Sequence, residues 1–114
     1  MKTTKYDKLV GDKIPELLRK KWIDFTSHVA NQEEYREKLI QKLQEEVQEL
    51  ISELLKPDTN KQHIANEIAD ILNVIEYLLK VEWITPEELN EAKERKDEKR
   101  GWFDKKIILE QTTE

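Results

Sequence analysis

The chain has no cysteine, and it has only 2 glycines and 3 prolines in 114 residues. Without cysteine, disulfides, zinc–thiolate sites and catalysis by a thiol are excluded. The scarcity of glycine and proline leaves few points at which a helix would be broken, so the composition favours a helical protein. The sequence also lacks a run of about 18 apolar residues and an apolar signal segment at its start. We therefore expect no membrane partner and a cytoplasmic location.

The sequence also has no excess of basic over acidic residues. The 20 Lys and Arg stand against 25 Asp and Glu, and the formal net charge is −5. This balance argues against nucleic acid as a partner, because nothing offsets the phosphate charge. Charged residues make up 39% of the chain, yet the apolar residues gather in helical stripes, which indicates amphipathic helices rather than disorder. At this length we expect one domain, residues 1–114, that association of copies would stabilise.

Capping signals and apolar periodicity predict four helices. Asp12, Asn31 and Thr85 are the expected N-caps of the first, second and fourth, and Gly101 suits the end of the last. A short turn at residues 57–60 makes the second and third helices antiparallel. The prediction is an all-α, four-helix-bundle-like domain that dimerisation completes. The expected helices cover residues 15–21, 32–56, 63–81 and 86–100.

Glu67 stands on the apolar face of the third helix. At about 100° per residue, it lies roughly 40° from Ile71, and Asp70 lies at the edge of the same face. An ionised carboxylate on such a face is costly unless it is paired or bound to a metal, and two carboxylates three residues apart repel each other. A divalent cation between Glu67 and Asp70 is the simplest solution. The alternative is a Lys or Arg partner from elsewhere in the chain.

The second helix carries another acidic set: Glu45, Glu46 and Glu49. With Val47 as the centre of the apolar stripe, Glu46 lies about 100° to one side. Glu46 and Glu49 have the spacing of Glu67 and Asp70, so two antiparallel helices can bring the two pairs together. Four carboxylates form an oxygen-lined site that suits Mg²⁺ or Mn²⁺ rather than Zn²⁺. The alternative is that the three glutamates form an ordinary solvated face.

The pattern Glu45-Glu46-x-x-Glu49, then seventeen residues, then Glu67-x-x-Asp70 resembles the EExxE…ExxD signature of the MazG-like all-α nucleoside triphosphate pyrophosphohydrolases. Two flanking stretches are similar to the branch that is phosphoribosyl-ATP pyrophosphohydrolase-like. YDKLVGDKIPELL at residues 6–18 is similar to its KLVRDKIPE opening, and KDEKRGWFDKKIIL at residues 96–109 to its K-x-x-x-R-G-x-F ending.

The resemblance implies Mg²⁺-dependent hydrolysis of a nucleoside triphosphate to a monophosphate and pyrophosphate, in a homodimer or homotetramer. It assigns four metal ligands, two carboxylates that act on the attacking water, and four contacts to the nucleotide. The implied ligands are Glu46, Glu49, Glu67 and Asp70; the implied catalytic carboxylates are Glu45 and Glu49; the implied substrate contacts are Lys13, Asn73, Lys96 and Arg100.

Several alternatives stay open at this level. Lys96 and Arg100 on a charged helix can simply be solvated or paired with Glu, and Asn73 can be a surface amide. Gly11 stands where the branch usually has Arg, which puts substrate affinity or range in question. The same acidic core serves phosphoribosyl-ATP hydrolysis in histidine biosynthesis equally well. A catalytically silent helical interaction module is the rival from another class.

Overall fold

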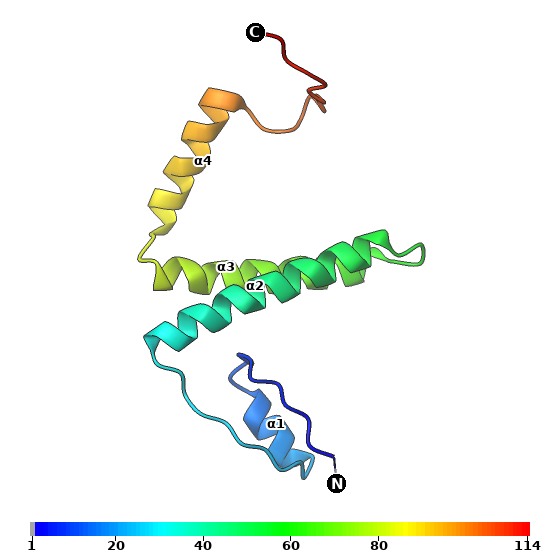
Figure 1. Ribbon diagram of the computed structural model, residues 1–114, viewed down its shortest axis with the longest axis vertical. Coiled ribbons are helices and arrows are strands. Elements are labelled where there is room, and N and C mark those ends of the chain that lie inside the picture. The colour runs from blue at the N-terminus through cyan, green and yellow to red at the C-terminus, as the bar shows by residue number, and fades with distance from the viewer. Residues whose placement is uncertain (1) are drawn as a thin grey trace. The chain divides into compact units, whose positions relative to one another are not determined.

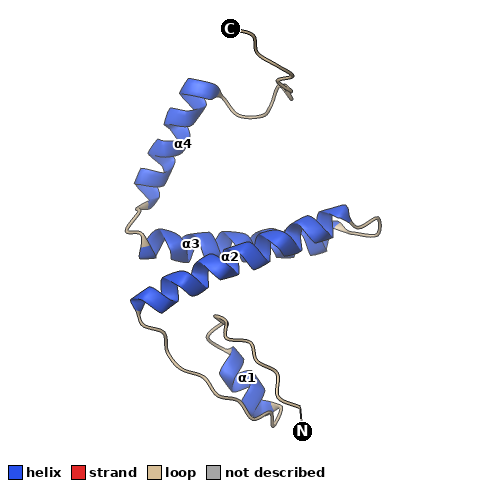
Figure 2. Cartoon of the chain, viewed as in Figure 1, coloured by secondary structure: helices blue, strands red, loops and turns tan. Residues whose placement is uncertain are grey.

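The structure, a computed structural model, describes residues 2–114 and contains four α-helices and no strand in that range (Figures 1 and 2). The all-α prediction is confirmed. None of the helices described is both long and apolar enough to reach across a membrane. The chain forms two compact units, Met1–Glu82 and Trp83–Glu114. The helices are α1 (Ile14–Lys20), α2 (Gln32–Leu55), α3 (Lys61–Val81) and α4 (Pro86–Arg100).

The helices α2 and α3 pack together as a hairpin, the main tertiary contact of the first unit (Figure 1). Each begins at an asparagine cap. The Asn31 side chain accepts a hydrogen bond from the Glu34 N–H at 2.9 Å, and the Asn60 side chain accepts one from the His63 N–H at 2.9 Å. The Asn31 cap was expected. Asn60 was expected to lie in the turn, and its capping role lets α3 begin at Lys61, two residues earlier than predicted.

The buried side of α2 differs from the side that the sequence favours. Leu39 and Val74 form the apolar centre of the hairpin, with Glu46 and Glu53 buried beside them. Val47, expected at the centre of the packed stripe, is 38% exposed. The stripe of α2 with the highest apolar content, which we call the outer stripe, therefore lies away from α3. Its members are Ile40, Val47, Ile51 and Leu54.

The segment before α1 is tied to α2 by two lysines. Lys38 Nζ donates to the backbone carbonyl of Asp7 at 2.6 Å, and Lys8 Nζ lies 3.7 Å from a Glu45 carboxylate oxygen. The prediction that Asp12 caps this helix is wrong. The helix begins at Ile14, so its N-cap is Lys13, which makes no side-chain capping bond, and Pro15 takes a first-turn position.

In the second unit, α4 begins and ends as predicted. Thr85 Oγ1 accepts a hydrogen bond from the Glu88 N–H at 3.1 Å, and Pro86 is the first helical residue. The hydroxyl also donates to the Glu88 carboxylate at 3.2 Å. Gly101 follows the last turn at φ 71°, a conformation that glycine adopts without steric cost. The side chains of Phe103 and Ile107 in the following tail are mostly exposed.

Candidate active site

Three carboxylates from the two helices of the hairpin converge. Glu46 and Glu49 on α2 and Glu67 on α3 each offer one oxygen, and these oxygens lie within 4.8 Å of one another. The i, i+3 spacing puts the two α2 residues on neighbouring positions of one helix face. The antiparallel packing of α3 then brings Glu67 to them. We predicted that acids from these two helices come together, and these three residues do so.

The convergence is electrostatically costly. Burial raises the pKa of Glu46 to about 7, with further contributions from the charges of Glu49 and Asp70. Burial also raises the pKa of Glu67, again with help from Glu49 and Asp70. Each of these effects disfavours the charged carboxylate. The group is thus under a strain that a cation would relieve.

One oxygen of Glu46 and one of Glu67 are buried without a hydrogen-bond partner. Buried polar atoms in proteins are normally satisfied, so these two unpartnered oxygens are candidates for contact with a bound ligand. In residues 2–114 no Lys, Arg or His side chain forms an ion pair with Glu67. Oxygen donors of this kind suit a hard divalent cation such as Mg²⁺ or Mn²⁺. The residues present therefore fit such an ion.

Asp70 and Asn73 lie beside this group. Asp70 is not one of the three carboxylates within 4.8 Å, but it is close enough to raise the pKa of both Glu46 and Glu67. Asp70, Asn73 and Glu46 share the wall of one pocket of about 440 Å³, which we call the hairpin pocket. Asn73 is thus at the acidic group rather than on an unrelated surface. Asp70 as a ligand stays a prediction.

Glu45 occupies a different environment. Its carboxylate lies 3.7 Å from Lys8 Nζ and 3.9 Å from Lys42 Nζ, and its side chain is 40% exposed. It is not part of the converging group. These ion pairs suit an outer position next to the site. Its catalytic role also stays a prediction.

The basic residues expected at the nucleotide belong to two different units of the chain. Lys13 caps α1 and does not line the hairpin pocket. Lys96 and Arg100 lie on α4, in the second unit, four residues apart and therefore on one face of that helix. Their contacts with a nucleotide remain proposals.

Sequence reasoning missed Lys42. Its Nζ lies 3.8 Å from a Glu46 oxygen, its side chain is only 25% exposed, and it lines the hairpin pocket. The signal was available, because Lys42 precedes Glu46 by four residues and therefore shares its helix face. Lys42 supplies a positive charge at the edge of the acidic group.

Glu53 was also missed, and it shows what a satisfied acid looks like in the same hairpin. It is as buried as Glu46, yet it accepts hydrogen bonds from Thr59 Oγ1 at 2.7 Å and from Lys56 Nζ at 3.1 Å, and His63 Nδ1 lies 3.3 Å away. These partners lower the pKa of Glu53. The opposite pKa shifts distinguish Glu46, a buried carboxylate with one unpartnered oxygen, from Glu53, whose oxygens both accept hydrogen bonds.

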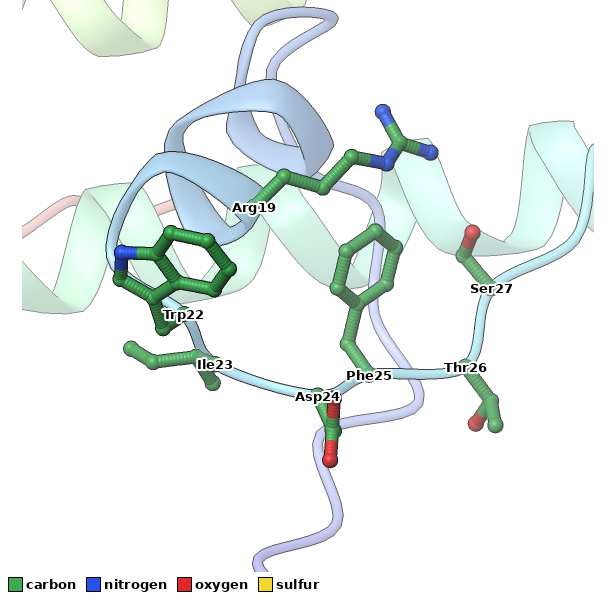
Figure 3. Close-up of a pocket in the computed structure, with 7 residues that line it drawn as sticks. All are labelled: Arg19, Trp22, Ile23, Asp24, Phe25, Thr26 and Ser27. Carbon is green, nitrogen blue, oxygen red and sulfur yellow. The ribbon is translucent and has the colours of Figure 1, made fainter.

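A second hollow, of about 600 Å³, is formed by the end of α1 and the stretch of chain that follows it (Figure 3). Arg19 extends over the ring of Phe25, with its guanidinium carbon 5.2 Å from the ring centroid. Trp22 and Asp24 also line it. Among the described residues, no converging acids or unpartnered buried atoms lie there, so the hairpin pocket is the better candidate site.

Comparison with protein families gives one match: residues 5–97 fit the family model described as PRA-PH, phosphoribosyl-ATP pyrophosphohydrolase. The match covers most of the chain and includes all three converging carboxylates, Lys42 and the greater part of α4. No curated protein matches the sequence, and no solved structure matches it either.

Proposed function

Since the chain belongs to the phosphoribosyl-ATP pyrophosphohydrolase family, and is thus a hydrolase of phosphorus-containing anhydrides, we propose that it cleaves a nucleoside triphosphate to a monophosphate and pyrophosphate. The proposed type of activity is the removal of non-standard or excess nucleotides. The observation that supports it is the pair of unpartnered buried oxygens on Glu46 and Glu67, within a group of acids that two helices contribute. A cation would offset the negative charges that this group brings together.

Glu46, Glu49 and Glu67 would hold Mg²⁺, or Mn²⁺ as a substitute, with Asp70 completing the set. The bound ion would supply charge neutralisation at the phosphate oxygens and polarisation of a water molecule. Glu49 is the exposed member of the group, so bulk water reaches it. It is placed to orient a water molecule and accept its proton, with Glu45 in an outer position.

Lys42 would contact a phosphate oxygen. In the structure its Nζ is near Glu45 and Glu46, but neither distance is that of a short hydrogen bond. A carboxylate that turns to a metal ion leaves the ammonium group free to face the anion next to it. Asn73, across the same pocket, would donate its amide N–H groups to the sugar or a phosphate. Lys13, Lys96 and Arg100 remain the further basic groups proposed for the polyphosphate.

Activity is tested by incubating the protein with a nucleotide panel and Mg²⁺ and measuring monophosphate and pyrophosphate. Glu49→Gln should lower kcat by about 10²–10⁴-fold, because it removes the proton acceptor without changing the side-chain volume. The matched control is Glu76→Gln, an exposed acid on α3 outside the acidic group, which should keep full activity. Release of orthophosphate, or a Glu49→Gln variant as active as the wild type, contradicts the proposal.

Phosphoribosyl-ATP is the second candidate substrate, because the matching family is described by that activity. The two candidates share the acidic group, so a direct comparison of kcat/KM for phosphoribosyl-ATP and for each nucleoside triphosphate separates them.

Melting curves distinguish both enzymatic activities from the alternative of a catalytically silent helical interaction module. Mg²⁺ at about 100 times its dissociation constant should stabilise the fold by about 2.7 kcal/mol, whereas a module without a metal site would not respond.

We further propose that the chain assembles as a homodimer or a dimer of dimers. The outer stripe of α2 is the strongest apolar periodicity of that helix, and its members are 37–52% exposed in the single chain. A contiguous apolar stripe of this kind is normally covered in a stable protein. A second copy of the hairpin would cover it and form the four-helix bundle that the sequence indicates.

A further inference from the structure

The hairpin pocket is acidic at one end and aromatic at the other. On α2 the lining residues run from Glu46 through Lys42 and Leu39 to Tyr35. On α3 they run in the opposite direction, from Asp70 through Asn73 and Val74 to Tyr77. Because the helices are antiparallel, Glu46 and Asp70 lie toward one end of the pocket, and Tyr35 and Tyr77 lie toward the other.

The pairing at each end is supported by the electrostatics. Asp70 is one of the charges that raise the pKa of Glu46, and Tyr77 is one of the groups that raise the pKa of Tyr35. Seven residues of α3 separate Asp70 from Tyr77, which is about 10 Å along the helix axis. That length is comparable to the separation of the phosphates and the base in an extended nucleotide.

The N-terminal segment forms the third wall. Leu9, Val10, Gly11 and Asp12 line the pocket opposite the hairpin. This wall is held in place by the bonds that Lys38 and Lys8 make between the segment and α2. Gly11 adds no side chain to this wall. With a volume of about 440 Å³, the pocket has room for a flat group between its walls.

We propose that the hairpin pocket holds the nucleoside part of the substrate, with the base against Tyr77 and Tyr35 and the phosphates at the acidic end. This inference rests on the proposed function and adds to it the residues that select for a nucleoside. Lys80 Nζ lies 4.8 Å from the centroid of the Tyr77 ring, and this cation–π contact helps to fix the ring. A base that stacks on a fixed aromatic ring gains affinity whatever its pattern of donors and acceptors.

The test compares Tyr77→Ala, Tyr77→Phe and the wild type in nucleoside triphosphate hydrolysis with Mg²⁺. The second ligand is inorganic tripolyphosphate, used as a competitive inhibitor because it has phosphates but no base or sugar. Tyr77→Ala should raise KM for the nucleotide about 5- to 150-fold, the range expected for loss of one base–aromatic stack. The inhibition constant of tripolyphosphate and kcat should change less than twofold. Tyr77→Phe should restore the wild-type KM, because it keeps the ring.

The matched control is Tyr6→Ala, since Tyr6 is the remaining tyrosine, is 70% exposed and does not line the pocket. It should leave KM unchanged. Tyr77 is 47% exposed, so its truncation should be tolerated; if Tyr77→Ala unfolds, Tyr77→Leu keeps apolar volume while removing the ring. An active wild type whose KM is unchanged in Tyr77→Ala or Tyr77→Leu overturns this inference alone, as does an equal loss of tripolyphosphate binding in these two variants. An inactive wild type overturns the proposed function itself.

Discussion

Glu46 makes the stability of the metal-free protein depend on pH. Its pKa is raised from the ordinary 4.5 to about 7 in the folded chain, so between these values the folded state holds a proton that the unfolded state has lost. The free energy of unfolding should therefore fall as the pH rises through this window, by at most about 3 to 4 kcal/mol at about 1.4 kcal/mol per pKa unit. Below about pH 4.5 both states are protonated and the pH dependence from this group disappears.

The measurement is a series of melting curves between about pH 5 and about pH 8 in the presence of a chelator. The melting temperature of the wild type should drop across the series, and that of Glu46→Gln should drop less, since glutamine cannot titrate. Mg²⁺ should stabilise the wild type more at the alkaline end, where the carboxylates are free of protons. A wild type whose stability is flat or rises with pH would show that Glu46 is not desolvated as described.

At the same scale, the sequence predicted the acids better than the bases. Glu67 stood out because a charge on an apolar face has few physical explanations, and its neighbours were expected from spacing alone. Lys42 was missed because a lysine on a charged helix carries no such anomaly in the sequence. Tyr35 and Tyr77 were missed for another reason: they meet only through the register of two helices, which periodicity does not fix.

The helix α3 depends on its cap. Asn60→Ala removes the side-chain acceptor of the His63 N–H and should lower the free energy of unfolding by about 1 kcal/mol. Asn66→Ala on the same helix is the control: it is exposed and interior to the helix, so the better helix propensity of alanine offsets the loss of its bond with Gln62. Circular dichroism in urea measures both. Equal destabilisation by the two variants would show that the cap has no special role.

The existence and order of the four helices could be predicted because the caps and apolar periods are local. The face on which α2 packs could not. Periodicity selects the most apolar side, centred on Val47, whereas the hairpin uses the side that carries Leu39, Glu46 and Glu53. A helix with two faces that can pack takes its orientation from the elements that cover them. Periodicity alone does not say which of the two faces of α2 packs against α3.

At the scale of the whole molecule, the outer stripe makes association testable. We expect light scattering after gel filtration to give a mass of two or four chains. Ile51→Glu places a charge on the outer stripe, where Ile51 is 44% exposed, and should dissociate the assembly while α2 and α3 stay helical. Ser52→Glu is the matched control, because it adds the same charge one residue along, at an exposed polar position outside the stripe, and should leave the mass unchanged. A wild type that elutes and scatters as a single chain contradicts the proposed assembly.

Side-chain contacts hold the hairpin together at both ends. At the turn, Glu53 contacts Thr59, Lys56 and His63, and at the open end Arg36 Nε donates a hydrogen bond to Glu82 at 2.5 Å. These contacts help to fix the register of α3 against α2. Because each residue advances a helix by about 100°, a residue inserted in α3 between His63 and Glu67 would turn Glu67 away from Glu46 and Glu49 without altering a single acidic side chain. The register of α3 is thus as important to the convergence of the three carboxylates as the carboxylates themselves.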